Sequence, residues 1–284
     1  MKKFILNVCF IIILFPSLHA QKVGLVLSGG GAKGITHIGI IKALEENNIP
    51  IDFISGASIG SLVGAYFSLY SDLHKLEEEI VMNKKEKLPT LFDLGFRGGL
   101  VSGRKFEAFF ERMLKRKTFN DCRIPLNIVA TDLMTGQKII LDQGNLASAV
   151  RASSSVPLVF EPVRHKGHLL VDGGLSDPVP VDAVKKMGAE IIIAVNLYHP
   201  NEFIEKRFNM PIVALRATRI ALHNLAKASI IGADVVLNPD TSRFMKTNSY
   251  KKYFDPPVAK ALIEIGRLEA KKLLPQIKKV LEQK

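Results

Sequence analysis

Two short glycine-rich segments near the start of the chain each follow an apolar run. Residues 28–34 read Ser-Gly-Gly-Gly-Ala-Lys-Gly after the run 23–27, and residues 56–60 read Gly-Ala-Ser-Ile-Gly after the run 51–55. Glycines let the backbone turn sharply from a strand into a helix without a Cβ clash. The first turn can present backbone N–H groups to an anion, and the second can expose a serine hydroxyl. The pair is typical of acyl hydrolases, in which an oxyanion site lies beside a nucleophile.

The second segment has the nucleophile-elbow pattern Gly56-x-Ser58-x-Gly60. Many matches to this pattern are ordinary loops, so the five residues alone are a weak signal. A β-rich run before the motif and a small-residue helical run after it strengthen the signal. We therefore predict that Ser58 is a nucleophile at the carboxyl end of a strand.

The first segment also fits a dinucleotide-binding fingerprint, with Gly29, Gly31 and Gly34 at the required spacing. Asp52 follows at about the distance expected of a ribose-binding acid. Against this interpretation, Asp52 begins a strand instead of ending one, and that strand leads to Ser58. A nucleotide site remains the alternative to an oxyanion site.

A third motif could supply the base that a serine needs. The apolar run 168–171 ends in Asp172-Gly173-Gly174, and a carboxylate followed by two glycines can approach another backbone turn closely. Asp-Gly is also a common β-turn dipeptide, so by itself this segment favours a plain turn.

Together the motifs resemble those of the patatin-like phospholipases. That family has a glycine-rich oxyanion loop, here Gly29-Gly30-Gly31-x-x-Gly34, a Gly-x-Ser-x-Gly elbow, and an Asp-Gly-Gly/Ala turn. Residues 152–157, Ala-Ser-Ser-Ser-Val-Pro, resemble a fourth block of the family. The four blocks occur in the family's order, and the resemblance extends from about Lys22 through Pro239.

The resemblance implies a catalytic dyad of Ser58 and Asp172 without a histidine. Asp172 would accept the serine proton, the N–H groups of Gly29, Gly30 and Gly31 would stabilise the oxyanion, and an acyl-enzyme would form. It implies a phospholipid or other lipid ester as substrate, with no cofactor and no metal. Lys33 could add positive charge near the glycine-rich loop, but we expect it to be a solvated lysine at the start of a helix.

A catalytic triad is also compatible with the sequence. His199 and His223 both follow Asp172, so the order serine, aspartate, histidine of the α/β-hydrolases is available. Most lone histidines are structural or solvated, and we predict that neither is needed for ester hydrolysis.

Strand and helix patterns alternate along most of the chain, which predicts one α/β domain with a mostly parallel central sheet covered by helices on both faces. The resemblance describes the same architecture as a three-layer sandwich. Residues 126–131 and 137–141 are expected to form an antiparallel hairpin. The other expected strands lie near 23–27, 51–55, 190–197 and 234–237, and the expected helices at 34–46, 58–70, 105–117, 181–187 and 217–231.

Two further segments could contact lipid, although a lysine-rich helix such as the second is usually just a solvated surface. Residues 71–105 mix charges, glycines and large apolar side chains, and they could form either a mobile lid or a plain connection. Residues 257–284 are expected to form an amphipathic helix broken at Pro275, with lysines on its outer face.

The N-terminus has the order of a secretory signal peptide: two lysines, an apolar run from Phe4 to Phe15, and a cleavage site after Ala20. We therefore expect residues 1–20 to be a signal peptide and residues 21–284 the exported domain, periplasmic or secreted. An uncleaved anchor is the alternative. Cleavage would leave Cys122 as the sole cysteine.

The chain has a net charge of +12 and an isoelectric point of about 9.6. Such a basic surface can bind anionic lipid headgroups or nucleic acid. We expect lipid headgroups to be the partner, because the sequence has no nucleic-acid-binding module and no aromatic stacking pattern. Together with the resemblance, this leads us to expect a lipid acyl hydrolase of phospholipase A or lysophospholipase type. The alternatives are a general carboxylesterase on soluble esters and a non-catalytic lipid- or nucleotide-binding module.

Overall fold

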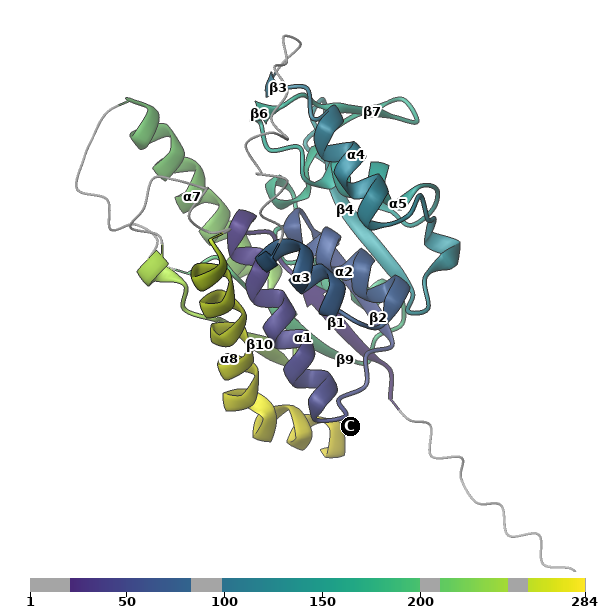
Figure 1. Cartoon of the computed structure of the whole chain (residues 1–284), viewed down its shortest axis with the longest axis vertical. Helices are drawn as coiled ribbons and strands as arrows, with labels where there is room; N and C mark the ends of the chain where they lie inside the picture. The colour runs from purple at the N-terminus through teal and green to yellow at the C-terminus, as the bar shows by residue number, and fades with distance from the viewer. Residues whose placement is uncertain (1–20, 83–98, 200–209, 245–254, 284) are drawn as a thin grey trace, which may run out of the picture.

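A computed structural model describes residues 21–82, 99–199, 210–244 and 255–283 of the chain (Figure 1). The expected signal peptide lies outside these residues, as does the central part of the expected lid, residues 83–98. One helix, α3 (His74–Met82), occupies the start of the predicted lid segment.

An eight-stranded sheet forms the centre of the protein, with the strand order β10-β9-β1-β2-β4-β8-β7 and β5 paired to β4. Neighbouring strands from β10 to β4 are parallel, whereas β5, β8 and β7 pair in antiparallel fashion. The predicted mostly parallel sheet and the hairpin β4–β5 are therefore confirmed. The strands are β1 (Val23–Leu27), β2 (Phe53–Ala57), β4 (Leu126–Asp132), β5 (Lys138–Leu141), β7 (Val163–His165), β8 (His168–Asp172), β9 (Ile191–Val195) and β10 (Val235–Leu237).

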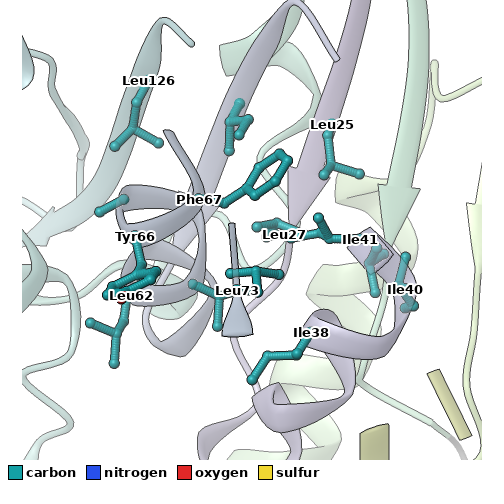
Figure 2. Packing of buried hydrophobic residues seen from close by; sticks show 14 of the residues in the cluster. Leu25, Leu27, Ile38, Ile40, Ile41, Leu62, Tyr66, Phe67, Leu73 and Leu126 are labelled. Atoms are coloured by element: carbon teal, nitrogen blue, oxygen red, sulfur yellow. The ribbon is translucent and has the colours of Figure 1, made fainter. Parts of the chain in front are cut away.

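Helices cover both faces of this sheet, as the alternation of elements predicted. Leu25 and Leu27 of β1 face one core, whereas Val26 faces the other, because successive strand side chains point to opposite faces. The first face is covered by α1 (Thr36–Glu46), α2 (Ile59–Tyr70) and α8 (Pro256–Gln283), and the second by α6 (Val181–Lys186) and α7 (Met210–Ser229). Figure 2 shows Leu25 and Leu27 among side chains of α1 and α2, including Ile41 and Phe67.

The contact between α1 and α8 brings two backbones together at glycines. A Cβ on Gly39 would lie 1.8 Å from the carbonyl oxygen of Ile263, and one on Gly266 would lie 2.1 Å from that of Thr36. Larger side chains at either position would separate the helices. This close packing holds α8 firmly on the sheet through α1.

The predicted break at Pro275 is wrong. Helix α8 continues from Pro256 to Gln283 with Pro275 inside it, and its ribbon bends in its last turns (Figure 1). A proline removes one hydrogen bond and kinks a helix without necessarily ending it. Burial of Ile277 beyond the proline keeps the last turns attached to the core.

Three elements near the site had no counterpart among the expected strands and helices. Helix α5 (Leu146–Ser153) lies between β3 (Gly99–Val101) and β6 (Leu158–Phe160) in the sequence, and these two strands form a separate parallel sheet. Helix α5 packs against α4 (Arg104–Met113), the helix expected at 105–117. Helix α5 has eight residues, and β3 and β6 have three each. Such short runs carry little periodicity, so tertiary contacts define them.

Candidate active site

Ser58 occupies a strained turn between β2 and α2. Its φ of 51° and ψ of −124° lie outside the conformations that a residue with a Cβ normally adopts. The flanking residues must be glycines because neighbouring backbone lies close to them. A Cβ on Gly60 would lie 2.1 Å from the carbonyl oxygen of Leu27, and one on Gly56 would lie 2.7 Å from the carbonyl oxygen of Gly60. The start of α2 thus packs directly on the end of β1.

Two serine hydroxyls hold this turn in place. The N–H of Ser58 donates to Oγ of Ser153 at 2.8 Å, and Oγ of Ser153 donates to the carbonyl oxygen of Val129 at 2.6 Å. Oγ of Ser61 donates to the carbonyl oxygen of Ser58 at 2.5 Å. The polar groups of the strained residue are therefore satisfied inside the protein, which fixes its orientation.

The hydroxyl of Ser58 contacts Asp172 directly. Oγ of Ser58 donates to Oδ2 of Asp172 at 2.6 Å, and the N–H of Gly174 donates to Oδ1 at 2.8 Å. This distance leaves no space for an imidazole between the serine and the carboxylate. The structure thus brings together the two residues predicted to form the dyad.

The sheet explains how residues far apart in sequence meet here. Ala57 pairs with Val129 in β4, and the next residue of β4, Ala130, pairs with Asp172 of β8. Both side chains consequently lie at the carboxyl end of the parallel strands. A Cβ on Gly173 would lie 2.0 Å from the carbonyl oxygen of Val129, so the Asp-Gly-Gly turn needs its glycine to approach β4.

Burial controls the acidity of Asp172. Desolvation raises its pKa from 3.8 to about 6, although the hydrogen bonds from Ser58 and Gly174 favour the charged form and oppose the shift. A carboxylate with this pKa is mostly ionised at neutral pH and is a stronger base than an ordinary aspartate. It can therefore accept a proton from a serine that attacks an ester.

The glycine-rich loop lies against the nucleophile. A Cβ on Gly29 would lie 3.4 Å from Cβ of Ser58, and Gly30 and Gly31 have positive φ values of 151° and 59°. The N–H of Gly29 donates to the carbonyl oxygen of Pro178 at 3.1 Å, so this amide is already engaged. Within the described part of the chain, the N–H groups of Gly30 and Gly31 have no such bond, which leaves them available to an oxyanion.

Lys33 is not a solvated lysine, so that expectation is wrong. It is 5% exposed, Nζ donates to the carbonyl oxygen of Leu197 at 2.7 Å, and it lies 5.5 Å from the ring centroid of Tyr198. The η1 turn (Gly31–Ile35) directs this side chain inward, toward the end of β9. The cation therefore fastens the glycine loop to the neighbouring strand.

Tyr198 lies between the two glycine turns of the site. Its hydroxyl oxygen is 2.5 Å from the position of a Cβ on Gly29 and 3.0 Å from that of a Cβ on Gly174. No sequence motif marks Tyr198, which lies three residues beyond the end of β9. Its position explains why both turns need glycine.

The two candidate triad histidines have other partners. Nδ1 of His223 bonds the carbonyl oxygen of Tyr198 at 2.8 Å, and Nδ1 of His199 lies 4.0 Å from Oδ1 of Asp240. Both oxygens of Asp172 are engaged by Ser58 and Gly174 instead. The geometry therefore offers no serine–histidine–aspartate relay through these residues.

A further histidine stabilises the loop. Nε2 of His37 donates to the carbonyl oxygen of Ser28 at 2.9 Å, and burial lowers the pKa of His37 to about 4, so the ring is neutral at physiological pH. Thr131 likewise supports the base, because its Oγ1 donates to the carbonyl oxygen of Asp172 at 2.8 Å. Both residues act on backbone atoms, a role that residue type and spacing do not reveal.

The structure separates Asp52 from the glycine loop. Oδ2 of Asp52 accepts from the N–H of Val23 at 2.8 Å, and Oδ1 forms an ion pair with Lys22. These groups lie at the start of β1, whereas Gly29 follows its end. Asp52 therefore cannot serve as the ribose-binding acid of a nucleotide held by that loop.

The described residues contain neither a candidate metal centre nor a candidate membrane span. No group of three or more histidine, cysteine or acidic side chains in these segments could hold a metal ion. No helix in the same segments is long and apolar enough to cross a membrane.

Comparison with known proteins points to one family. The sequence model described as patatin-like phospholipase matches residues 25–185. Patatin-like phospholipase domain-containing protein 7 of Rattus norvegicus is 29% identical over 261 residues, which cover 85% of this chain and 19% of that protein. Patatin-like phospholipase domain-containing protein 6 of Homo sapiens is 32% identical over 191 residues, which cover 65% of this chain and 14% of that protein.

A lysophospholipase and a bacterial structure are also similar. Lysophospholipase NTE1 of Scheffersomyces stipitis is 34% identical over 188 residues, covering 63% of this chain and 12% of that protein. The chain thus spans less than a fifth of each of these three relatives. The crystal structure of VipD from Legionella pneumophila shares the fold, with a TM-score of 0.61 at 16% identity over 90% of this chain and 67% of that chain.

Proposed function

This chain belongs to the patatin-like phospholipase family, as its motifs indicated, and we propose that it hydrolyses carboxylic esters of lipids as a phospholipase A or lysophospholipase. The observation that carries the proposal is the direct 2.6 Å hydrogen bond from Ser58 to the buried carboxylate of Asp172. A nucleophile paired with a base of raised pKa is what ester hydrolysis requires.

In the proposed first half-reaction, Oγ of Ser58 attacks the ester carbonyl carbon while its proton passes to Oδ2 of Asp172. The carbonyl oxygen becomes an oxyanion, which the free N–H groups of Gly30 and Gly31 stabilise. Each such donor contributes about 3–4 kcal/mol in known enzymes. The tetrahedral intermediate then collapses, Asp172 returns the proton to the leaving alcohol, and the acyl group stays on Ser58.

In the second half-reaction, water attacks the acyl-enzyme. Asp172 takes a proton from the water as the new C–O bond forms, and the oxyanion occupies the same N–H groups. Collapse releases the fatty acid, and the proton returns from Asp172 to Oγ of Ser58. The dyad thereby returns to its starting state, and no cofactor or metal takes part in any step.

We further propose that the protein is exported after removal of residues 1–20 and acts at the surface of an anionic membrane. The net charge of +12 falls to +10 when the leader, with Lys2 and Lys3, is removed. A basic protein is attracted to anionic headgroups by about 1 kcal/mol for each well-placed lysine or arginine.

Release of fatty acid tests the proposal. Wild type, Ser58→Ala and Asp172→Asn are compared on phospholipid vesicles and on a short-chain ester in solution. Hydrolysis of vesicle lipid by wild type alone supports a phospholipase. Hydrolysis of the soluble ester alone would favour a general carboxylesterase, and no hydrolysis of either substrate would favour a lipid-binding module.

A further inference from the structure

The hairpin of β7 and β8 extends beyond the edge of the sheet that carries the dyad. Asp132, the last residue of β4, pairs with Leu170, and the N–H of Leu133 donates to the carbonyl oxygen of Leu169. The residues of β8 before Leu169 therefore lie past the carboxyl end of β4. Four residue steps separate His168 from Asp172, which places the start of β8 roughly 14 Å from the base.

A tight turn at the tip of this hairpin presents positive charge. Lys166 and Gly167 have φ values of 46° and 87°, as in the two-residue turns that join twisted antiparallel strands. Arg164 and Lys166 are the exposed charged side chains of residues 156–168. Within residues 132–137, the exposed side chains include no charged group.

Large apolar side chains are exposed at the same edge. Met134 is 76% exposed and Leu133 47% exposed in the turn after β4, and Leu158 of β6 is 81% exposed. Leu158 also has a φ of 69°, an unfavourable conformation for a leucine, so both its exposure and its backbone cost free energy. Strained backbone of this kind is concentrated at functional sites.

These segments lie at one end of the molecule. Figure 1 shows β6 and β7 together at the end to which the parallel strands point, with the end of α8 far away at the opposite end. The segment of β6 is also tied to the site, because the N–H of Asp172 donates to the carbonyl oxygen of Ser155 at 3.0 Å, just before Val156 and Leu158.

We propose that this end, formed by residues 133–134, 156–158 and 164–166 and called the docking face below, binds the surface of an anionic lipid bilayer. The inference rests on the proposed function and deepens it by naming the surface that meets the substrate. A face that exposes both basic and large apolar side chains matches a bilayer, which offers anionic headgroups and acyl chains. The lysine-rich end of α8, which the sequence suggested for this role, faces away from it.

Two pairs of charge reversals test the proposal with equal changes in net charge. Arg164→Glu/Lys166→Glu alters the docking face, and Lys278→Glu/Lys279→Glu alters exposed lysines near the end of α8. Binding of the full-length mature protein is measured by co-sedimentation with vesicles of phosphatidylglycerol and phosphatidylcholine. We expect the first pair to weaken binding at least about tenfold, and the second to change it less than about twofold.

A second comparison tests the apolar rim. Met134→Gln/Leu158→Gln removes two exposed side chains of the docking face, and Ile231→Gln/Leu268→Gln removes two that are 78% and 56% exposed elsewhere. We expect only the first double variant to lose vesicle binding. All four double variants should hydrolyse a short-chain soluble ester like wild type, because none alters the dyad or the glycine loop.

Several outcomes would overturn the docking face. They are an equal loss of vesicle binding in both charge-reversal variants, no loss of vesicle binding in either, or a wild-type protein that does not bind anionic vesicles. A wild-type dimer in solution that only Met134→Gln/Leu158→Gln dissociates, without vesicle binding, would assign the face to a second copy of the chain. A wild type that binds vesicles through this face but cleaves no ester would refute the proposed function and leave the docking face standing.

Discussion

Replacing Asp172 by asparagine should stabilise the protein at neutral pH while it abolishes ester hydrolysis. The carboxylate is buried, and its pKa is raised from 3.8 to about 6. The folded protein therefore binds the proton of Asp172 more tightly than the unfolded chain does. Between about pH 4 and pH 6 the unfolded chain loses this proton first, so the free energy of unfolding falls as pH rises through that window.

The size of the effect follows from the same two pKa values. At about 1.4 kcal/mol per pH unit, the ionised Asp172 costs about 3 kcal/mol at pH 7.5 and about 1 kcal/mol at pH 4.5. Asparagine has nearly the same shape and carries no charge. Its Oδ1 can accept from the N–H of Gly174, and its Nδ2 can donate to Oγ of Ser58, so both hydrogen bonds at this side chain have a replacement.

Urea denaturation at the two pH values measures the difference in unfolding free energy between wild type and Asp172→Asn. The variant should gain up to about 3 kcal/mol at pH 7.5 and about a third of that at pH 4.5. Ser58→Ala is the matched control, because it also removes activity but keeps the buried carboxylate, and it should show no such gain. A gain that does not depend on pH, or a loss of stability at pH 7.5, would refute the assigned burial cost.

Further predictions concern the groups around the dyad. Gly29→Ala should lower kcat/KM for a soluble ester at least about tenfold, because its Cβ would lie 2.5 Å from the hydroxyl oxygen of Tyr198, and adding Tyr198→Phe should restore part of the loss. No rescue would contradict that contact. Ser153→Ala should destabilise the protein by about 1–3 kcal/mol in urea denaturation and lower kcat, because the N–H of the nucleophile loses its acceptor. His199→Ala and His223→Ala should keep most esterase activity, and a loss of about a hundredfold in either would argue for a histidine relay.

Much of the fold could be predicted from the sequence because its central strands can be recognised from their own residues. All five residues of β1 and of β9 are buried, and such runs of apolar residues between helical patterns indicate a parallel sheet covered on both faces. The short elements β6 and α5 could not be predicted in this way. Their positions depend on contacts such as the hydrogen bonds from Arg151 to the carbonyl oxygens of Ser102 and Gly103, which join segments distant in the sequence.

In the site, too, some residues could be predicted from local motifs, whereas the environment of others depends on tertiary contacts. Ser58 and Asp172 lie in motifs whose glycines are required by the backbone, so their spacing was visible in the sequence. A lysine at a helix start is usually solvated, and the burial of Lys33 is favourable only because Leu197, in the segment after β9, provides a carbonyl oxygen. No pattern in the residues around Lys33 indicates that its acceptor is the carbonyl oxygen of Leu197, 164 residues later in the sequence.

The dyad combines two features that each destabilise the fold, namely the positive φ of Ser58 and the buried charge of Asp172. Both are held by neutral groups: Ser153 binds the backbone of the nucleophile, and Thr131 and Gly174 bind the backbone and the carboxylate of the base. A cation placed beside Asp172 would relieve its burial cost but would also lower its pKa and weaken it as a base. The neutral surroundings therefore keep the carboxylate reactive, and the rest of the fold must compensate for the stability that the site loses.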